Sequence, residues 1–390
     1  MKILFVYSSP IDYVRGGIQK VTYNMAVQFK EIGHEVLFLS FGKGYSMMTR
    51  TEFPQFLVPN IKISACDENV QYMTDFVVRE EIDVVINQAG MSHEIFGALS
   101  KSKRNSQFVL ISCIHNSIFG GVENYDRTHG SQLQKVHLTF LAPLFRQTWM
   151  KSLLCRLYIL KNRQFYRHLC DTSDDVIVLT EAMCHEMVRM TGRNNPNVRK
   201  IPNGTIIPNI NLSTMEKEKF FLYVGKLDYG YKRVDMLLPI WKKFSQKHSD
   251  WRLFIIGGGV NEGDLKNRVK KENIINVQFE GWKEVTDYYR KAAGLLLTSC
   301  SESFGMVLVE AMSYGVIPFA YDAFDQIHEI IDDGINGFLA PDNDPDRMAL
   351  IMSYAIERPD IAEVVAQNAI RKSYQFDSKS IAAKWLELIQ

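Results

Sequence analysis

Hydrophobic residues recur along this chain with two spacings, which distinguish strands from helices. Uninterrupted apolar runs at Lys2–Tyr7 and Glu35–Ser40 predict two buried strands. Between these runs, apolar side chains recur at helical spacing, at Ile18, Val21, Met25, Phe29 and Ile32. The helical spacing stops at Gly33, a residue typical of helix ends. A strand, a helix and a strand in this order form a β-α-β unit, the seed of a parallel sheet.

The same alternation continues, is interrupted and then restarts. Strand-like runs follow at Asp83–Asn87, Phe108–Ile114 and Asp175–Thr180. Turn chemistry at Ile201–Gly204 and a polar stretch at Asn209–Lys219 then break the pattern. Beyond the break come strand-like runs at Phe220–Val224, Trp251–Ile256, Asn276–Glu280, Leu295–Thr298 and Ile317–Tyr321, with helical stretches near Arg233–Lys247, Gly263–Lys271, Val285–Ala292 and Met306–Tyr314. We therefore expect an α/β protein with two doubly wound, Rossmann-like domains of parallel sheet and a boundary near residue 210.

The composition agrees with two globular domains. The chain has 390 residues, of which 46% are hydrophobic and 23% charged, and these are ordinary values for a soluble protein. The first apolar run is too short for a signal peptide, and no stretch approaches the ~20 apolar residues of a membrane span. Six scattered cysteines without a C-x-x-C pair favour reduced thiols in the cytoplasm. A net charge of +1 argues against nucleic acid as a partner.

One segment departs from this balanced charge. Residues 131–170 contain neither Asp nor Glu. Among bulky apolar residues, the segment holds the cations Lys135, Arg146, Lys151, Arg156, Lys161, Arg163 and Arg167. This mixture predicts one or two amphipathic helices that lie on an anionic membrane surface. The alternative is a packed helical pair whose cations face water.

Two glycines, Gly16 and Gly17, separate the first predicted strand from the first predicted helix. Glycine at this place lets the backbone approach a ligand, and a helix N-terminus presents unpaired N–H groups to a phosphate. A tight turn without a ligand explains the pair equally well. The pattern is not G-x-G-x-x-G, so it does not indicate a dinucleotide site.

Basic side chains also follow predicted strands, at the sheet edge where α/β proteins bind ligands. Lys226 comes just after the strand 220–224, and Lys232 follows six residues later. Two such lysines can clamp a diphosphate through charge-assisted hydrogen bonds. His115 ends the strand 108–114 at the corresponding edge of the first domain. Each residue taken alone has a simpler interpretation, as a solvated lysine or a structural histidine.

The sharpest motif is Glu302-Ser303-Phe304-Gly305, with Glu310 about two helical turns further on. Glu310 lies on a stretch that is otherwise apolar. An unpaired buried carboxylate is costly, so Glu310 predicts a hydrogen-bonding ligand or a basic partner. Glu302 lies in the preceding loop, where the alternative is a first-turn carboxylate that complements the helix dipole.

Two other patterns are interpreted as structural. Gly257-Gly258-Gly259 lacks the third glycine of a dinucleotide fingerprint, because Glu262 stands in its place, so we expect a simple glycine turn. The D-x-D sequence Asp342-Asn343-Asp344 has the form of a metal-binding motif. Pro345 follows at once, and Asp before a Pro at the first helical position is typical of helix capping. We therefore expect a cap and no metal site.

In this order, the features resemble the retaining glycosyltransferase family four, which has the GT-B fold. The resemblance covers nearly the whole chain and is most specific at the Glu-x7-Glu block. It rests on Gly16-Gly17, His115, Val176–Met187, Ile201–Gly204, Gly225-Lys226, Lys232, Glu302, Glu310–Pro318 and Asp333–Leu339. By this resemblance, residues 1–208 form an N-terminal domain, to which a helix at 375–390 returns. Residues 209–374 form a C-terminal nucleotide-sugar-binding domain, and the two domains face each other across a cleft.

The resemblance also implies how the donor is held. The nucleotide sugar would bind in the cleft, mainly to the second domain, with no metal ion and no other cofactor. Glu310 would accept hydrogen bonds from the ribose hydroxyls. Lys226 and Lys232 would hold the diphosphate and stabilise the charge that develops on it.

The remaining roles concern the sugar and the first domain. Glu302 and the backbone amides of Phe304 and Gly305 would hold hydroxyls of the donor sugar. His115 would contact the sugar near the reacting centre, and the backbone at Gly16-Gly17 would help to bind phosphate. We count His115, Glu302, Lys226 and Lys232 as candidate catalytic residues.

The chain departs from the family pattern at two places. Lys226 stands where the family usually has Arg, which keeps the charge but loses bidentate geometry. Asp325–Glu329 stands where the family often has Gly-Gly-x-x-Glu, and only Glu329 is kept. This second departure leaves the identity of the donor sugar open.

The sequence therefore predicts a retaining, metal-independent glycosyltransferase. It would move a hexose or N-acetylhexosamine from a UDP-linked donor to a glycan or lipid-linked glycan acceptor in surface polysaccharide synthesis. We expect the protein in the cytoplasm, at the inner face of the membrane if the segment 131–170 binds lipid. The alternatives are a nucleotide-sugar epimerase of the same fold and a non-catalytic sugar-nucleotide-binding protein.

Overall fold

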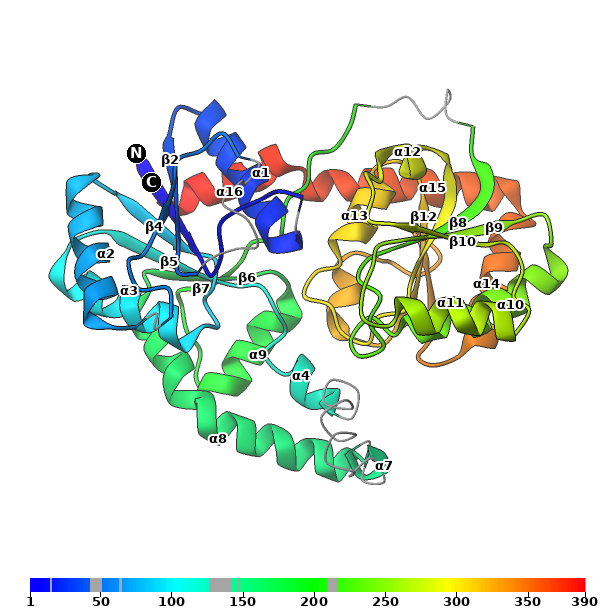
Figure 1. The fold of residues 1–390 in the computed structure, drawn as a ribbon, viewed down its shortest axis with the longest axis horizontal. Helices are drawn as coiled ribbons and strands as arrows, with labels where there is room; N and C mark the ends of the chain where they lie inside the picture. The colour runs from blue at the N-terminus through cyan, green and yellow to red at the C-terminus, as the bar shows by residue number, and fades with distance from the viewer. Residues whose placement is uncertain are drawn as a thin grey trace. The chain divides into compact units, whose positions relative to one another are not determined.

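The computed structural model describes residues 1–14, 16–42, 51–62, 65–125, 142–145, 147–209 and 216–389. The chain divides into two compact units, each of which is built around its own parallel sheet (Figure 1). The first unit comprises Met1–Ile118, Arg156–Ile206 and Phe376–Gln390. The second comprises Phe119–Cys155 and Ile207–Gln375.

The sheet of the first unit has seven strands, which are all parallel and lie in the order β3-β2-β1-β4-β5-β6-β7. The strands are β1 (Lys2–Tyr7), β2 (Glu35–Ser40), β3 (Gln55–Leu57), β4 (Val84–Asn87), β5 (Val109–Ile114), β6 (Asp175–Val178) and β7 (Val198–Lys200). The central strands β1 and β4 are buried along almost their whole length because helices cover both faces of the sheet.

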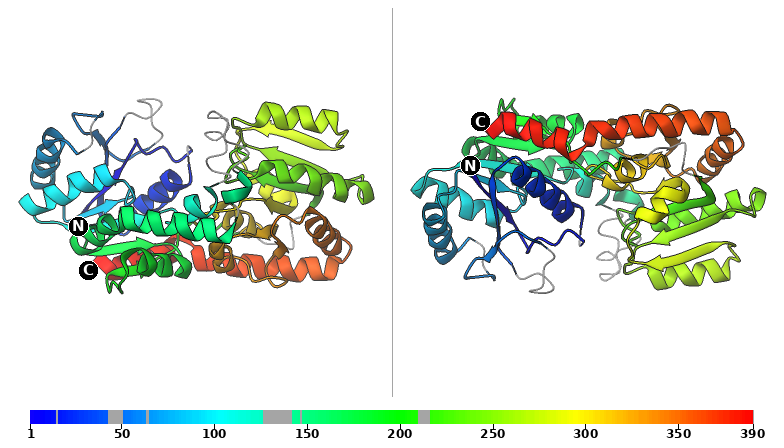
Figure 2. Two further views of the ribbon diagram at one scale, coloured as in Figure 1. Left: turned by 90° about the horizontal axis from the view of Figure 1, so that it is seen from below. Right: turned by 90° about the horizontal axis from the view of Figure 1, so that it is seen from above.

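The helices of the first unit cross over between these strands. They are α1 (Gly17–Glu31), α2 (Asp67–Arg79), α3 (His93–Asn105), α9 (Glu181–Thr191), α16 (Ser378–Ile389) and most of α8 (Thr148–Thr172). The last helix, α16, lies beside α1, and its Ile381 and Trp385 share a buried cluster with Met25 and Phe29 of α1 (Figure 2). The C-terminal helix therefore completes the core of the unit that the N-terminus begins.

The second unit repeats this design with six parallel strands in the order β10-β9-β8-β11-β12-β13. Its strands are β8 (Glu218–Val224), β9 (Arg252–Ile256), β10 (Val277–Gly281), β11 (Ala292–Leu297), β12 (Ile317–Asp322) and β13 (Phe338–Pro341). Its main helices are α10 (Leu237–Lys247), α11 (Glu262–Lys271), α12 (Thr286–Lys291), α13 (Met306–Met312), α14 (Pro345–Ile356) and α15 (Pro359–Ser373). The core packs Trp241 and Phe244 of α10 on Phe221 of β8.

The structure confirms the predicted fold class and the ten predicted strands, with shifts of at most three residues at their ends. It places one segment differently from the predicted domain division. Phe119–Cys155 groups with the second unit, although we expected it in the first domain. A physical reason is visible in α4 (Gly120–Glu123), because the amide of Asn124 at its end donates to the carbonyl of Cys300 at 3.5 Å. The predicted helices of the basic segment are α7 (Ala142–Phe145) and α8, while Lys135 and Arg146 lie outside the described residues.

Candidate functional site

The second unit has a topological switch point between β8 and β11. From β8 the chain builds outward through β9 and β10, and it then returns to the other side of β8 with β11. Connections leave adjacent strands in opposite directions at such a point, and α/β sheets bind ligands at its carboxyl edge. The loops that leave this edge contain Gly225-Lys226 after β8, Gly257–Gly259 after β9 and Thr298–Glu302 after β11. The sequence motifs of the second half therefore meet where the topology predicts a ligand.

The glycine turn after β9 packs against the loop that carries Lys226. A Cβ atom on Gly257 would lie 1.8 Å from the carbonyl oxygen of Gly225, and one on Gly259 would lie 2.3 Å from that of Leu227. Backbone hydrogen bonds join the two loops, since the Leu227 N–H donates to the Gly258 carbonyl at 3.0 Å. Only glycine permits this approach, so the prediction of a structural glycine turn is confirmed. The Lys226 side chain itself is exposed.

The structure brings Lys232 and Glu302 into direct contact. The Lys232 ammonium donates to Glu302 Oε1 at 2.5 Å, and the Ser299 hydroxyl donates to the same oxygen at 2.6 Å. The Glu302 side chain is 13% exposed and that of Lys232 is 30% exposed. A pair this sheltered holds both side chains in place while part of each still faces solvent. The interpretation of Glu302 as a dipole-complementing residue does not account for this ion pair.

Arg233, which the sequence analysis did not single out, holds this region together. It is fully buried and takes a left-handed backbone conformation with φ 46°. Its guanidinium donates to the Thr298 carbonyl at 2.7 Å and pairs with Asp342 at 2.6 Å. The side chain therefore links the loop after β8 to the loop before Glu302 and to the loop after β13.

The Asp342–Asp344 sequence caps a helix and pairs with Arg233. The Asp344 carboxylate accepts from the Arg347 N–H at 2.8 Å and caps α14, with Pro345 at its first position. The predicted helix cap is therefore confirmed, and Asp342 is used by Arg233. Among the residues that the structure describes, no three His, Cys, Asp or Glu side chains gather into a possible metal site.

Glu310 lies on α13, whose other side chains mostly enter the core. Leu308, Val309, Ala311 and Met312 are buried, whereas Glu310 is half-buried. Its carboxylate accepts from the Tyr289 hydroxyl at 3.3 Å. Burial and the neighbouring carboxylate raise the pKa of Tyr289 well above its usual value, so the hydroxyl stays protonated and can donate to Glu310. The partner that Glu310 was expected to need therefore includes a tyrosine hydroxyl.

Phe304 and Gly305 precede this helix. Phe304 is buried, and Gly305 has φ 77°, a conformation that favours glycine. Gly305 turns the chain from the Glu302 loop into α13, which leads to Glu310. The spacing between the two glutamates is thus fixed by one tight turn and one short helix.

In the first unit, Gly16 and Gly17 begin α1 without a packing reason to be glycine. A Cβ atom at either residue would meet nothing within 4 Å, and the φ of Gly16 is 175°, which any residue can adopt. Neither a close protein neighbour nor a left-handed conformation therefore accounts for the pair. The interpretation that a ligand approaches this backbone gains support from the open space around it.

His115 lies after β5, at the carboxyl edge beside the switch point between β1 and β4. It is 7% exposed, and its Nε2 contacts the Gln88 side-chain oxygen, which leaves Nδ1 without a hydrogen bond. Both residues line a cavity of about 20 Å³, which has room for roughly one water molecule. Burial lowers the pKa of His115 to about 4, so the imidazole is neutral at pH 7.

Comparisons with known proteins agree with this arrangement. Residues 210–372 match the family model described as glycosyl transferases group 1, and this range contains Lys226, Lys232, Glu302 and Glu310. An uncharacterized glycosyltransferase of Haemophilus influenzae is 29% identical over 217 residues, which are 55% of this chain and 60% of the relative.

The name of a second relative states its substrate. It is the Campylobacter jejuni GalNAc-alpha-(1->4)-GalNAc-alpha-(1->3)-diNAcBac-PP-undecaprenol alpha-1,4-N-acetyl-D-galactosaminyltransferase, 27% identical over 178 residues, which are 45% of this chain and 49% of that enzyme. The chain thus spans about half to three fifths of the length of these two relatives.

The solved structures extend over the whole chain. Anabaena Alr3699/HepE in complex with UDP superposes with a TM-score of 0.73 and 17% identity, and the match covers 100% of this chain and 99% of that one. This likeness shows the GT-B fold, with its two Rossmann-like domains. Over residues 210–372, the chain is similar to the family of glycosyl transferases group 1.

Proposed function

We propose that this protein is a retaining, metal-independent glycosyltransferase. It transfers a hexose or N-acetylhexosamine from a nucleotide sugar, UDP-linked by preference, to a glycan or lipid-linked glycan acceptor in surface polysaccharide synthesis. The observation that carries the proposal is the Lys232–Glu302 pair at the switch point between β8 and β11, with Lys226 on the neighbouring loop. The family match over residues 210–372 supports the same activity.

The two lysines suit a reaction in which negative charge grows on a leaving diphosphate. An ammonium group has three N–H donors, and Glu302 occupies one of those of Lys232. The remaining donors are available to phosphate oxygens, while Glu302 and Ser299 fix the group in place. Lys226 is exposed and supplies a second charge from a loop that glycine packing holds in position. Both charges stabilise the transition state more than the bound donor, because the leaving group gains charge as the bond breaks.

The transfer of the sugar needs no nucleophile from the protein. The acceptor hydroxyl attacks the anomeric carbon from the face that the diphosphate leaves, and the diphosphate takes the hydroxyl proton. The glycosidic bond to phosphate breaks as the bond to the acceptor forms, and the configuration is retained. His115 is neutral at pH 7, so it contributes to sugar binding as a hydrogen-bonding group and not as a cation. The Gly16-Gly17 backbone keeps its proposed role at the phosphate.

The proposed donor and acceptor are based on proteins that resemble this chain. The Anabaena protein of the same fold was solved with UDP, which supports a uridine nucleotide. The Campylobacter relative acts on an undecaprenol-linked glycan by its printed name, which supports a lipid-linked acceptor. Such an acceptor places the enzyme at the inner face of the cytoplasmic membrane. No helix among the described residues is long and apolar enough to cross a bilayer.

A two-step experiment tests the proposal. Thermal unfolding is first measured with UDP, GDP and ADP, because a bound nucleotide raises stability by RT ln(1 + [L]/Kd). UDP should raise the melting temperature most. Products of UDP-glucose, UDP-galactose and their N-acetyl forms are then analysed with and without glycan acceptors. Transfer with an α-configured product from an α-configured donor is expected. Interconversion of donors without an acceptor would indicate an epimerase, and nucleotide binding without any turnover would indicate a binding protein.

A further inference from the structure

Helix α8 has two apolar faces, of which only one is buried. The buried face includes Cys155, Tyr166, Leu169 and Cys170, each at most 4% exposed. A second set of large apolar side chains on the same helix faces solvent: Trp149 at 58%, Leu153 at 45%, Leu157 at 54% and Leu160 at 73%. These four residues are called the outer stripe below.

The outer stripe is continuous along the helix. Its members follow one another at intervals of four, four and three residues. At about 100° per residue, these intervals keep all four side chains within an arc of about 80°. A row of four exposed large apolar side chains on one helix face is unusual for a surface that meets only water, and it indicates an interaction surface.

The charged residues of α8 are all positive until its end. The first acidic residue of α8 is Asp171, near its end. Arg156 and Lys161 flank the stripe, about 20° and about 40° beyond the two ends of its arc, whereas Lys151 lies on the far side of the helix. None of these three cations forms an ion pair with a described residue. Their long side chains can lie along apolar neighbours while the charged ends reach outward.

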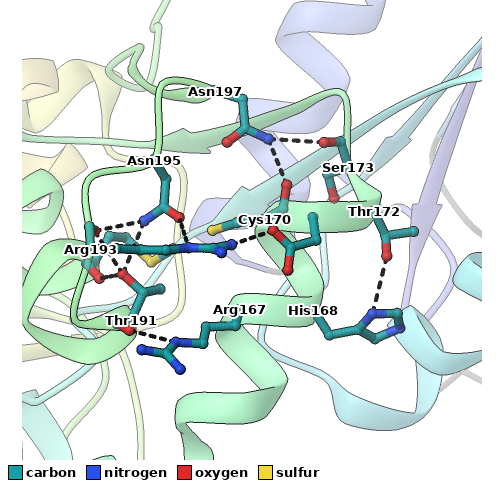
Figure 3. A network of polar contacts seen from close by, with 11 residues as sticks. Arg167, His168, Cys170, Thr172, Ser173, Thr191, Arg193, Asn195 and Asn197 are labelled. Carbon is teal, nitrogen blue, oxygen red and sulfur yellow. Dashed lines mark hydrogen bonds and ion pairs between the residues drawn. The ribbon is translucent and has the colours of Figure 1, made fainter.

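The other two arginines of α8 form hydrogen bonds within the protein. The Arg163 guanidinium donates to the Met190 carbonyl at 3.1 Å. That of Arg167 donates to the Thr191 carbonyl at 2.7 Å, as Figure 3 shows. Both carbonyls belong to the end of α9. The predicted role of these two arginines as membrane contacts is therefore replaced by a role as anchors of the C-terminal half of α8. These bonds fix the C-terminal half of α8 to α9, and the outer stripe lies on the N-terminal half.

We infer that the outer stripe of α8 inserts into the interfacial region of an anionic lipid bilayer. Apolar side chains would enter the headgroup boundary, while Arg156 and Lys161 meet anionic headgroups. A second copy of the chain fits the stripe less well, because pairing two such helices would oppose cations without any acid between them. The inference deepens the proposed function and rests on its lipid-linked acceptor.

Vesicle co-sedimentation tests this surface. Vesicles of phosphatidylcholine are compared with vesicles that also contain phosphatidylglycerol, at low and high salt. The protein should bind only the anionic vesicles, and salt should weaken the binding. The double substitution Trp149→Ser with Leu157→Ser should lower the vesicle affinity at least about tenfold, as should Arg156→Gln combined with Lys161→Gln. Val78→Ser is the matched control, since Val78 is 64% exposed on helix α2 of the first unit.

Tryptophan fluorescence provides a readout that needs no disruptive substitution. Trp149 is 58% exposed and Trp282 is 70% exposed, so both report on solvent in the free protein. Brominated lipids should quench Trp149 and leave Trp282 unquenched. The quenched signal should therefore disappear in Trp149→Phe and persist in Trp282→Phe.

Several outcomes would overturn the inference. They are equal binding to both vesicle types, unchanged binding by the Trp149→Ser, Leu157→Ser protein, or quenching that persists in Trp149→Phe. A sedimentation mass that falls from dimer to monomer on the double substitution would assign the stripe to a second copy. Transfer to a water-soluble acceptor is measured in parallel. Transfer without vesicle binding defeats this inference alone, whereas vesicle binding without transfer defeats the proposed function alone.

Discussion

Lys232 and Glu302 form an ion pair although they lie 70 residues apart in the sequence. The pair joins the loop after β8 to the loop after β11, which are the two strands on either side of the switch point. Arg233, the next residue, ties the same loops from the buried side. The position of Lys232 near the surface thus depends on Arg233 in the core.

Substitution of the two candidate diphosphate lysines should lower turnover. We expect Lys232→Ala and Lys226→Ala each to reduce kcat by about a hundredfold, because each removes a charge that acts as the leaving group becomes negative. Lys219→Ala is the control, since Lys219 is an exposed lysine on β8 that pairs with Asp250. Steady-state kinetics separate the effects. A change in KM with unchanged kcat would mean that the lysines bind donor and transition state equally.

Glu310→Ala should weaken nucleotide-sugar binding in a protein that still folds. Loss of a charged hydrogen-bonding partner costs about 1.5–3 kcal/mol, which corresponds to roughly a ten- to hundredfold loss of donor affinity by calorimetry. Tyr289→Phe removes only the hydroxyl that donates to Glu310 and should have a smaller effect. Donor affinity that is unchanged in folded Glu310→Ala would remove Glu310 from the site.

The spacing of apolar residues along the sequence was sufficient to predict most strands and helices. It was not sufficient to predict the contacts between them. Long apolar runs such as Lys2–Tyr7 and Glu35–Ser40 are confirmed as strands with the same ends. The strands β3, β7 and β13 were missed because each has only three or four residues, too few to show a period. The candidate residues at strand ends could be found because the carboxyl edge of a parallel sheet is a known place for ligands.

The role of Arg233 could not be predicted from the sequence. A basic residue beside Lys232 gives no local signal that its side chain is fully buried. Its hydrogen-bonding partners lie 65 and 110 residues away, on other loops. For the same reason, Glu302 and Lys232 were assigned to different parts of the donor although they touch each other.

Arg233→Met should destabilise the protein and impair catalysis together. Removal of one partner of a buried ion pair costs about 3 kcal/mol or more, because Asp342 and two carbonyls lose their donor. The Lys232 and Glu302 loops should lose their relative position as a result. Chemical denaturation measures the free energy of unfolding, and kcat is measured below the transition. Normal kcat in a destabilised protein would limit Arg233 to a structural role.

Transfer should continue in the presence of EDTA. Lys226 and Lys232 can neutralise the diphosphate, and the D-x-D sequence is used for a helix cap and for Arg233. Initial rates are measured after chelation and again after addition of magnesium or manganese. Loss of activity that a divalent ion restores would overturn the metal-independent mechanism.

Lys217 should make the stability of the protein depend on pH above neutrality. Its ammonium donates to the carbonyls of Tyr289 at 3.2 Å and Tyr314 at 2.8 Å, and burial lowers the pKa of Lys217 to about 7. In the unfolded chain, a lysine has a pKa near 10.4. Between these two values the unfolded state binds a proton that the folded state lacks, so this group makes the free energy of unfolding rise with pH. Below pH 7 both states are protonated, and the cost of burying the charge is fully present.

The comparison of the parent protein with Lys217→Met isolates this contribution, because other titrating groups cancel in the difference. The free energy of unfolding of the parent, minus that of the variant, should rise by up to about 1.4 kcal/mol per pH unit from pH 7 toward pH 10. Loss of the two carbonyl hydrogen bonds shifts the level of this difference but not its slope. Lys219→Met, at an exposed lysine two residues further on, should give a flat difference over the same range. Parallel curves for the parent and Lys217→Met, measured by urea denaturation at each pH, would show that Lys217 keeps an ordinary pKa in the folded protein.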